Sequence, residues 1–382
     1  MIATEEHQAF RDVVRDFARR EFAPHVEHWE AAGELPLDAV GAMADLGLFG
    51  IVFPEEMGGG GGDFTSLCIA IEEIGRVSQS LGITLSAAVG LGANPIFRFG
   101  TAEQQARWLP DLVAGRRLGA FGLTEPDAGS DAGGTRTKAV EDRTTGEWVI
   151  DGSKAFITNS GTPITSIITV TALSGPGEIS TFVVPSGTPG LTVEPGYRKL
   201  GWHASDTHGL SLDGCRVPAD HMLGARGSGL RNFLSILDDG RIAISALAVG
   251  CAQACLDLAV DYAKERQAFG GAIGRFQGIA FQLADLAVAV ENSRNLTYTA
   301  AALKDRGEAC TQAASMAKLY STEAAVDATR VATQVFGGMG FIEESPVARF
   351  YRDAKILEIG EGTSEIQRLV IARGLGLPVS TR

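Results

Sequence analysis

The sequence predicts an α+β fold in which a helical block, a block of β-strands and a second helical block follow one another along the chain. Short β-branched runs occur between about Gly119 and Pro218, separated by clusters of Gly, Pro, Asp and Ser. Apolar residues at helical spacing dominate on both sides of this region. Because strands and helices do not alternate, and no G-x-G-x-x-G sequence occurs, we expect neither a doubly wound sheet nor a nicotinamide-binding fingerprint.

The pattern of the first block, residues 1–118, indicates helices. Phe10, Val14 and Phe17 recur at helical spacing in a charged segment, and residues 64–74 continue the same pattern. Five consecutive glycines, residues 58–62, must form a loop. No Gly-Lys pair follows them, so we interpret this run as a flexible turn rather than a phosphate-binding loop.

The middle block, residues 119–223, is predicted to be an antiparallel β region. Its β-branched runs include residues 148–150, 166–170, 181–184 and 191–193. The third block, residues 224–382, returns to helical spacing.

The most apolar part of the third block, Ile242 to Val260, has the length of a membrane span. Gln253 and Asp257 interrupt it, and Gly, Ala and Ser are frequent. We therefore predict a helix buried inside a large assembly and no membrane insertion.

Charge and cysteine content limit the partners and the compartment. A formal net charge of −13 argues against nucleic acid and against an anionic membrane surface. The five cysteines are scattered, which predicts buried thiols in a reducing compartment rather than a disulfide framework. Cys251 and Cys255 lie one helical turn apart, but no third metal ligand stands near them. The N-terminal residues have neither a basic start nor an apolar run, so we expect no signal peptide and a cytoplasmic location.

The candidate catalytic groups are carboxylates, because the motifs G-x-S-x-G and H-E-x-x-H are absent. His25 and His28 share a helical turn, but without a third ligand they indicate a solvated face, and no metal site is expected. Glu361 stands between Gly360 and Gly362, just before a predicted helix that Thr363 could cap. A carboxylate at this junction can meet a ligand; it can equally be an acid that complements the helix dipole.

The loop from Thr124 to Ser130 leaves two interpretations open in the same way. Its hydroxyls and successive backbone N–H groups could hold an anion or the edge of a ring. It could also be a simple turn that enters a strand.

Two stretches together resemble one family, the acyl-CoA dehydrogenases. Residues 122–131 (GLTEPDAGSD) are similar to the family's flavin and thioester loop, and residues 359–368 (IGEGTSEIQR) to the segment that carries its base. Further similar blocks lie in the expected order at residues 54–59, 151–159, 199–202, 215–218, 265–270 and 334–341. The resemblance implies an N-terminal α-helical domain (1–118), a central antiparallel β-barrel-like domain (119–223) and a C-terminal four-helix bundle (224–382).

The resemblance also implies an FAD cofactor and a role for each matching position. Glu361 would be the catalytic base. Asp238, Arg241, Ser130 and Gly362 would contact the acyl-CoA. The cofactor contacts would come from Phe121, Leu123, Thr124, Gly129, Ser130, Phe156, Thr158, Arg266, Phe269, Gln277, Gln334, Gly337, Gly338, Thr363 and Glu365. Arg266, Phe269 and the 334–338 segment would reach the FAD of a neighbouring subunit, which implies a homo-oligomer, usually a tetramer.

In the implied reaction, Glu361 takes the pro-R α-proton of an acyl thioester and the β-hydride passes to flavin N5. The product is the trans-2-enoyl thioester, and an electron-transferring flavoprotein receives the electrons. Hydrogen bonds to the thioester carbonyl, one of them from the Glu361 backbone N–H, would stabilise the developing enolate. Desolvation would raise the pKa of the base.

Three positions depart from common family patterns. Some members carry the base at the position of Gly240, which has no side chain to serve. Phe156 replaces a frequent Trp, and Gly360 replaces a Tyr common in straight-chain members. The alternatives that remain are a dehydrogenase acting on a carrier-protein-bound acyl group, a flavin oxidase of the same fold and a non-catalytic family member.

Overall fold

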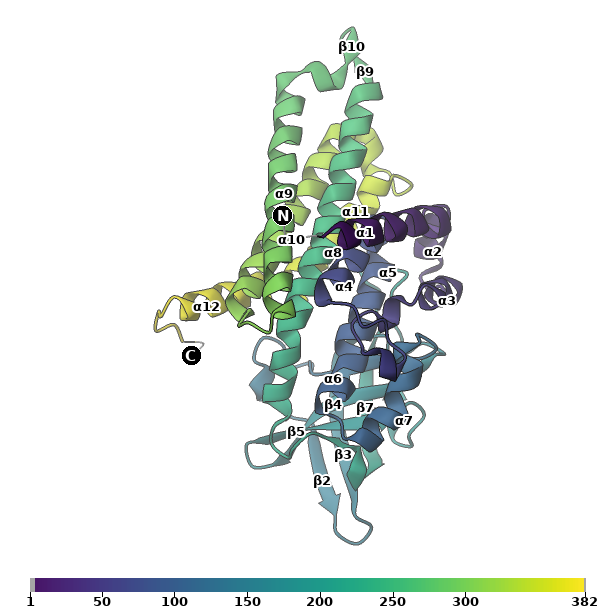
Figure 1. Ribbon diagram of the computed structural model, residues 1–382, viewed down its shortest axis with the longest axis vertical. Helices are drawn as coiled ribbons and strands as arrows, with labels where there is room; N and C mark the ends of the chain where they lie inside the picture. Colours follow the sequence, from purple (N-terminus) through teal and green to yellow (C-terminus); the bar gives the residue numbers. More distant parts are fainter. Residues whose placement is uncertain (1–3, 381–382) are drawn as a thin grey trace.

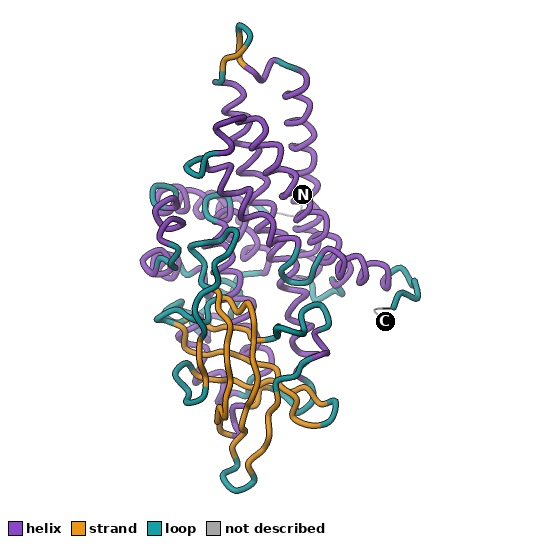
Figure 2. The backbone as a smooth tube through the Cα atoms, turned by 180° about the vertical axis from the view of Figure 1, so that it is seen from behind, coloured by secondary structure: helices purple, strands orange, loops and turns teal. Residues whose placement is uncertain are grey.

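The computed structural model describes residues 4–380 and has the three-block order that the sequence predicts. The strands gather at one end of the molecule, and two long helices reach the other end, where the short β9 and β10 strands lie (Figure 1). The view from behind has the same arrangement, with the large sheet at the bottom and the β9–β10 hairpin at the top (Figure 2). The α+β fold class is therefore confirmed.

The first block is helical. Its helices are α1 (Glu5–Phe17), α2 (Val26–Ala32), α3 (Leu37–Asp45), α4 (Phe64–Gly75), α5 (Gln79–Ser86), α6 (Asn94–Phe99) and α7 (Ala102–Val113). Side-chain caps start several of them: Asp63 accepts from the backbone N–H of Ser66, and Thr101 accepts from that of Gln104. The glycine run 58–62 is a loop, as predicted. Close packing accounts for Gly59, where a Cβ would collide with the Phe53 carbonyl, whereas Gly58 and Gly61 have φ values of +80° and +61°.

The middle block forms an eight-stranded sheet. Its strands are β1 (Leu118–Gly122), β2 (Lys138–Asp142), β3 (Glu147–Thr158), β4 (Thr165–Gly175), β5 (Glu178–Pro185), β6 (Leu191–Val193), β7 (Thr207–Pro218) and β8 (Met222–Leu223). The order is β6-β7-β3-β2-β4-β5-β8, with β1 paired to β4. Buried side chains such as Ile150, Ile168, Phe182 and Leu210 form one core inside this sheet.

The prediction of a purely antiparallel region needs one correction. Strand β1 pairs with β4 in parallel, with Ala120 opposite Ile168, and β2 meets β4 in parallel at Lys138 and Leu173. A parallel pair needs a long crossover, and here β2 and β3 lie between β1 and β4 in the chain. Strand composition carries no information on this direction, so the sequence pattern could not predict it.

The third block contains the longest helices. Its elements are α8 (Gly229–Glu265), β9 (Gln267–Ala268), β10 (Gly271–Ala272), α9 (Gln277–Asp305), α10 (Thr311–Phe336), α11 (Pro346–Ala354) and α12 (Ser364–Gly374). Helices α8, α9 and α10 pack on one another, and α11 and α12 pack on α10. At about 1.5 Å per residue, the 37 residues of α8 extend for roughly 55 Å, from the sheet to the opposite end of the molecule.

The apolar part of α8 is a core helix, as predicted for Ile242–Val260. Two helical stretches, residues 79–99 and 229–265, are long and apolar enough to cross a membrane, and 78% of the most apolar window of each is buried inside the protein. Cys251 and Cys255 lie in this buried part of α8 as free thiols. Within residues 4–380, no group of three potential ligands is arranged to hold a metal ion.

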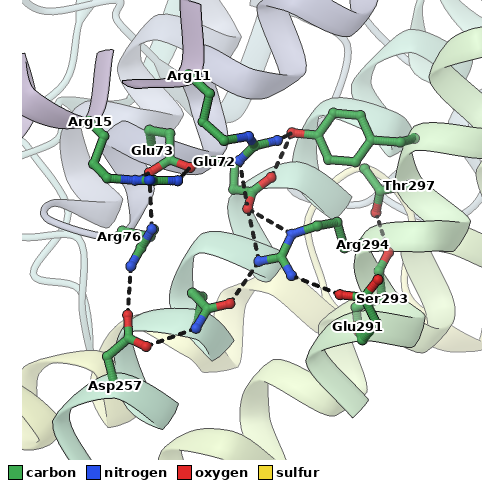
Figure 3. A network of polar contacts seen from close by, with 12 residues as sticks. Arg11, Arg15, Glu72, Glu73, Arg76, Asp257, Glu291, Ser293, Arg294 and Thr297 are labelled. Carbon is green, nitrogen blue, oxygen red and sulfur yellow. Dashed lines mark hydrogen bonds and ion pairs between the residues drawn. The ribbon is translucent and has the colours of Figure 1, made fainter. Parts of the chain in front are cut away.

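A network of buried ion pairs joins the first block to the third (Figure 3). Glu73 of α4 accepts from Arg11 at 2.6 Å and from Arg15 at 2.9 Å, and its side chain is fully buried. Glu72, beside it, pairs with Arg294 of α9 at 3.1 Å. Arg76 extends the network from Glu73 to α8. These contacts fix α1 and α4 against the helices that carry the site described next.

Candidate active site

Glu361 lies at a sharp turn between α11 and α12. Its φ is +55° and that of Gly362 is +92°, so two consecutive residues adopt left-handed backbone conformations. For a residue with a Cβ this conformation costs about 1–2 kcal/mol, and such strain is often found at functional sites. The next residue, Thr363, caps α12 by accepting from the backbone N–H of Ile366 at 3.4 Å, as the sequence predicts. The turn leaves the backbone N–H of Glu361 without a hydrogen bond to any described residue.

The carboxylate of Glu361 lies directly against Gly240 of α8. A Cβ at position 240 would stand 2.5 Å from Oε2 of Glu361, so only glycine leaves room for the carboxylate there. Oε2 is buried and has no hydrogen-bond partner among the described residues. Burial raises the pKa of Glu361 to about 7, against the opposing effect of the nearby Arg241 and Lys318 cations. A carboxyl with this pKa can accept a proton near neutral pH.

Asp238 and Arg241, predicted to hold CoA, form an ion pair on α8, two residues before and one residue after Gly240. The Nη1 of Arg241 donates to Oδ1 of Asp238 at 2.6 Å, and Thr311 of α10 donates to Oδ2 at 2.7 Å. Nε of Arg241 is buried and has no acceptor within residues 4–380. A buried donor of this kind requires a partner, so it can receive an acceptor atom from a ligand beside Glu361.

The loop from Leu123 to Ser130 packs on β3. The backbone N–H of Ala155 donates to the Thr124 carbonyl at 2.9 Å. Beneath the loop, Lys154 is completely buried and its Nζ lies 2.8 Å from Oε1 of Glu125. Glu125 also accepts from the backbone N–H of Arg136 at 2.7 Å. This ion pair holds the loop in place. Sequence reasoning missed it because its members are 29 residues apart.

Phe156 and Thr158 stand on β3 next to this loop. Phe156 has a φ of +60° at an irregularity in the pairing of β3 with β7, and the residue is 65% exposed. Its ring lies 5.1 Å from that of Tyr197. The hydroxyls of Thr124 and Thr158 donate to no described residue. An exposed aromatic face beside two free hydroxyls fits the planar, hydrogen-bonding ring of a flavin.

The loop residues and Glu361 belong to one region of the molecule. Phe121 of β1 stacks on Phe233 of α8, with ring centroids 3.8 Å apart. Phe233 and Gly240 are seven residues apart on α8, which is about 10 Å along the helix. Leu123 belongs to the same apolar cluster as Phe121. Gly129 and Ser130 are exposed at the end of the loop. A flat ligand on this loop can therefore lie close to the carboxylate of Glu361.

The other predicted cofactor residues lie far from Glu361 in the same chain. Arg266 follows the end of α8, roughly 40 Å along the helix from Gly240 at 1.5 Å per residue. Phe269, in the β9–β10 hairpin, is 91% exposed and has a φ of +51°. Phe336 stacks on Tyr262 at 4.2 Å, so the end of α10 lies at this same end of α8. The predicted residues gathered here are Arg266, Phe269, Gln277, Gln334, Gly337 and Gly338.

Two further residues contact the Glu361 turn and were not identified from the sequence. Lys318 of α10 is completely buried and donates to the Gly362 carbonyl at 2.8 Å. Gln367 of α12 donates to the same carbonyl at 2.8 Å and to that of Glu361 at 3.2 Å. Lys318 is the one charged residue in the otherwise small and apolar stretch 313–319, and this pattern could have revealed it from the sequence. Glu365, in contrast, is exposed on the first turn of α12.

Three family models match the chain in succession. They are the acyl-CoA dehydrogenase N-terminal domain (residues 4–116), middle domain (residues 120–215) and C-terminal domain (residues 227–376). Among curated proteins, a probable acyl-CoA dehydrogenase of Bacillus subtilis is 50% identical and is covered to 98%, with 97% of this chain aligned. The human mitochondrial short-chain specific acyl-CoA dehydrogenase is 44% identical, over 96% of this chain and 89% of the human protein.

Solved structures agree over almost the whole length. Butyryl-CoA dehydrogenase from Megasphaera elsdenii has a TM-score of 0.94 at 41% identity, covering 98% of each chain. A chain from a structure described as the electron transferring flavoprotein of Acidaminococcus fermentans has a TM-score of 0.94 at 40% identity, again over 98% of each chain. A Mycobacterium smegmatis glutaryl-CoA dehydrogenase in complex with FADH2 has a TM-score of 0.95 at 30% identity, covering all of this chain and 97% of the other.

Proposed function

The chain belongs to the acyl-CoA dehydrogenase family, a family of flavin-dependent oxidoreductases, and on this premise we propose that it oxidises the Cα–Cβ bond of a short-chain acyl-CoA with Glu361 as the base. The observation that carries the proposal is the Glu361 carboxyl itself. Its Oε2 is buried against Gly240 and has no partner in the described chain, and its pKa is raised to about 7. A base that must remove a weakly acidic α-proton at neutral pH needs this combination.

The remaining groups around Glu361 support a bound thioester. The backbone N–H of Glu361 is free to donate to the thioester carbonyl, where negative charge develops as the α-proton leaves. The buried Nε of Arg241 can receive a polar atom of the CoA moiety. Gly360 leaves open space beside the turn for the acyl group, because a Cβ there would meet only the Ile356 carbonyl, at 3.5 Å.

FAD is the cofactor in this proposal, and when bound it accepts the hydride from the β-carbon. Thr124, Thr158 and the exposed ring of Phe156 would hold its ring system beside the loop on β3. Gly129 and Ser130 would contribute backbone and hydroxyl contacts, and Thr363 and Glu365 would close the site at the start of α12. The glutaryl-CoA dehydrogenase of similar fold contains FADH2, which supports this choice.

The distance between the two sets of predicted cofactor residues supports a homo-oligomer. A single extended dinucleotide cannot contact the β3 loop and the distant residues Arg266 and Gln334 of one chain across roughly 40 Å along α8. A second chain that brings its own Arg266 end to the β3 loop satisfies both sets. We propose a tetramer, in keeping with the resemblance stated from the sequence.

The short chain length and the electron acceptor are taken from relatives. The human relative is named as short-chain specific, and the M. elsdenii relative as a butyryl-CoA dehydrogenase. The structural relative from A. fermentans occurs in a structure of an electron transferring flavoprotein. We therefore propose butyryl-CoA or a similarly short thioester as substrate, and an electron-transferring flavoprotein as acceptor. The cytoplasmic location stays a prediction.

The direct test is anaerobic mixing of the purified holoprotein with acyl-CoA esters from C4 to C16. We expect the visible flavin absorbance to bleach fastest with the shortest chains. Fastest bleaching with long chains would contradict the substrate class and leave the reaction type intact. Absence of bleaching with every CoA ester, together with bleaching by an acyl group on a carrier protein, would assign the protein to the carrier-dependent alternative.

A further inference from the structure

Lys318 is a buried cation beside the proposed base. Its side chain has no exposed surface and lies among small residues in the first third of α10. Burying an ammonium group is costly unless hydrogen bonds and opposite charges compensate for the lost water. Desolvation lowers the pKa of Lys318 to about 8, so the group still carries its charge at neutral pH. A lysine in such a position needs a structural or chemical reason.

The one hydrogen bond that the Lys318 side chain makes within the described chain is to the Glu361 turn. Its Nζ donates to the Gly362 carbonyl at 2.8 Å. It forms no ion pair closer than 4 Å with any carboxylate of residues 4–380. Its charge therefore acts on the Glu361 carboxylate through space rather than through a direct ion pair. The surroundings are buried and poorly screened, so this electrostatic effect is larger than it would be in water.

Gln367 donates to the same carbonyl without contributing charge. Its Nε2 lies 2.8 Å from the Gly362 oxygen and 3.2 Å from the Glu361 oxygen. Both donors point at the two residues that have positive φ. A pair of donors on one carbonyl compensates for the strained backbone of the turn and fixes the direction in which the Glu361 side chain leaves it.

We propose that Lys318 is a positioning residue for Glu361: its ammonium holds the Glu361–Gly362 turn through the Gly362 carbonyl, and its positive charge favours the ionised form of the Glu361 carboxyl. The proposal rests on the proposed function, in which Glu361 must be ionised to accept the α-proton. Gln367 supports the same turn by geometry alone. Comparing the two residues therefore separates the positioning of the turn from the effect of charge, since both donate to the Gly362 carbonyl but only Lys318 is charged.

Other charged residues near the turn also act on Glu361 and Lys318. Glu361 faces Arg241 of α8 and Lys318 of α10. Arg241 is itself paired with Asp238 at 2.6 Å, which reduces its net field. Lys318 faces Glu361, Glu358 and Glu323, with Arg241 as the repelling cation. Arg241 has the larger effect on the pKa of Glu361 and Lys318 the next, so Lys318 is the cation near Glu361 that also holds the turn through the Gly362 carbonyl.

The test compares Lys318→Met with Gln367→Met in the holoprotein. Each variant loses one donor to the Gly362 carbonyl, and only Lys318→Met loses a charge. The rate of anaerobic flavin reduction is measured from pH 5.5 to 9. In parallel, the carboxyl stretch that disappears in Glu361→Gln is followed by infrared difference spectroscopy as pH changes. The second measurement reports protonation of Glu361 without any reaction.

In Lys318→Met we expect both the pH–rate midpoint and the infrared midpoint to rise by about one pH unit or more, because an opposite charge lowers a carboxyl pKa by about that amount. In Gln367→Met we expect a lower rate at every pH with unchanged midpoints. Unchanged midpoints in Lys318→Met would overturn the proposal. Lys318→Gln, which lacks the charge but can still donate, carries the same test if Lys318→Met does not fold. A wild-type protein that no acyl-CoA reduces would instead refute the proposed function, and the infrared midpoints would still decide the effect of Lys318.

Discussion

The carboxylate of Glu361 occupies the space that a side chain on Gly240 would fill. A Cβ at position 240 would lie 2.5 Å from Oε2 of Glu361, which is closer than non-bonded atoms approach. Gly240 is in the buried part of α8, a helix whose own propensity would favour alanine there. The glycine is therefore explained by the position of the carboxylate rather than by the helix. Any side chain at position 240 would therefore require the Glu361 carboxylate to move from this position.

Gly240→Ala should displace the Glu361 carboxylate and slow the reaction. A shift of about 1 Å in a reacting group can cost on the order of 100-fold in rate, so we expect a loss of this size in flavin reduction by acyl-CoA. FAD content should stay unchanged, because no predicted cofactor contact is moved. The measurement is the single-turnover rate of flavin bleaching in the variant and the wild type.

Gly41→Ala is the matched control for this substitution. Gly41 also lies within a helix, α3, and a Cβ there would meet no atom within 4 Å. It should leave the rate unchanged and raise stability by about 0.4–1 kcal/mol. Equal rates for Gly240→Ala and the wild type would show that the carboxylate does not need its position beside Gly240 for the reaction.

The raised pKa of Glu361 predicts a pH dependence with a definite sign. A base must be unprotonated, so kcat/KM should fall about tenfold per pH unit below pH 7 and be level above it. The folded protein binds this proton more tightly than the unfolded chain does. Stability is therefore lost as pH rises from the ordinary pKa of Glu to about 7.

Glu361→Gln removes the ionisable group behind both the pH dependence of kcat/KM and the pH dependence of stability. At pH 8 we expect the variant to have a higher Tm than the wild type, because it avoids a buried charge, and at pH 4 the two should be alike. Scanning calorimetry at the two pH values measures this difference. A variant that is less stable than the wild type at pH 8 would mean that the ionised carboxyl is well stabilised in the folded state.

Glu365 provides a second comparison, for the chemical step. Glu361→Gln should retain FAD and bind acyl-CoA with a shifted flavin spectrum, but lose about 10²- to 10⁴-fold in the rate of bleaching. Glu365 is exposed on the first turn of α12, so Glu365→Gln should weaken FAD binding more than it slows bleaching at saturating FAD. Stopped-flow absorbance and FAD titration separate the two outcomes. Wild-type bleaching by Glu361→Gln would direct the search for a base to Asp238 and Asp239.

The sequence predicts the order of helices and strands well, because hydrophobic period and turn residues are local properties. It predicts the helix start at Thr363 for the same reason. It does not predict the parallel pairing of β1 with β4, since strand direction depends on chain topology. It predicts the loop at residues 58–62 but not the close packing of Gly59 and Gly62, which depends on contacts with Phe53 and Ile51.

In the candidate site, too, local features could be predicted from the sequence and long-range contacts could not. The candidate base could be identified from short motifs because its segment is contiguous in sequence. Lys318, Gln367 and the Glu125–Lys154 pair act across the fold, and nothing in their local sequence indicates which partner each one meets. The resemblance supplied the roles of Arg266 and Gln334, whereas composition and spacing supplied none. Long-range contacts of buried polar groups are therefore what the single sequence lacks.

The ion network around Glu73 should contribute strongly to stability. Glu73 is fully buried and shared by Arg11, Arg15 and Arg76, whose positive charges hold the pKa of its carboxyl below the ordinary value. Glu73→Gln would leave these buried or half-buried cations without their common partner, and we expect a loss of about 3 kcal/mol. Urea unfolding at pH 7 measures it.

Asp111→Asn is the control for the Glu73 prediction. Asp111 pairs with Arg116 at 2.8 Å, and both side chains are more than half exposed, so the loss should be at most about 1 kcal/mol. The stabilisation from Glu73 is present above the unfolded-state pKa and is lost as pH falls through the lower folded-state pKa. The gap between wild type and Glu73→Gln should therefore close at acid pH. A gap that persists there would indicate a packing effect.

Arg266 should act on the FAD of a neighbouring chain, and two inactive variants can test this together. Glu361→Gln lacks the base, and Arg266→Ala should bind FAD poorly. In a mixed assembly, a site has every group when its base comes from an Arg266→Ala chain and its Arg266 comes from a Glu361→Gln chain. Random pairing across a two-chain interface should then restore about a quarter of the wild-type activity. The control is the Glu361→Gln/Arg266→Ala double variant, co-expressed with Glu361→Gln, which has no intact base in any chain. If Arg266 served its own chain, every site in the mixture would lack either the base or Arg266, and the mixture would be as inactive as this control. The roughly 40 Å of α8 between Arg266 and Gly240 argues for the neighbouring chain instead.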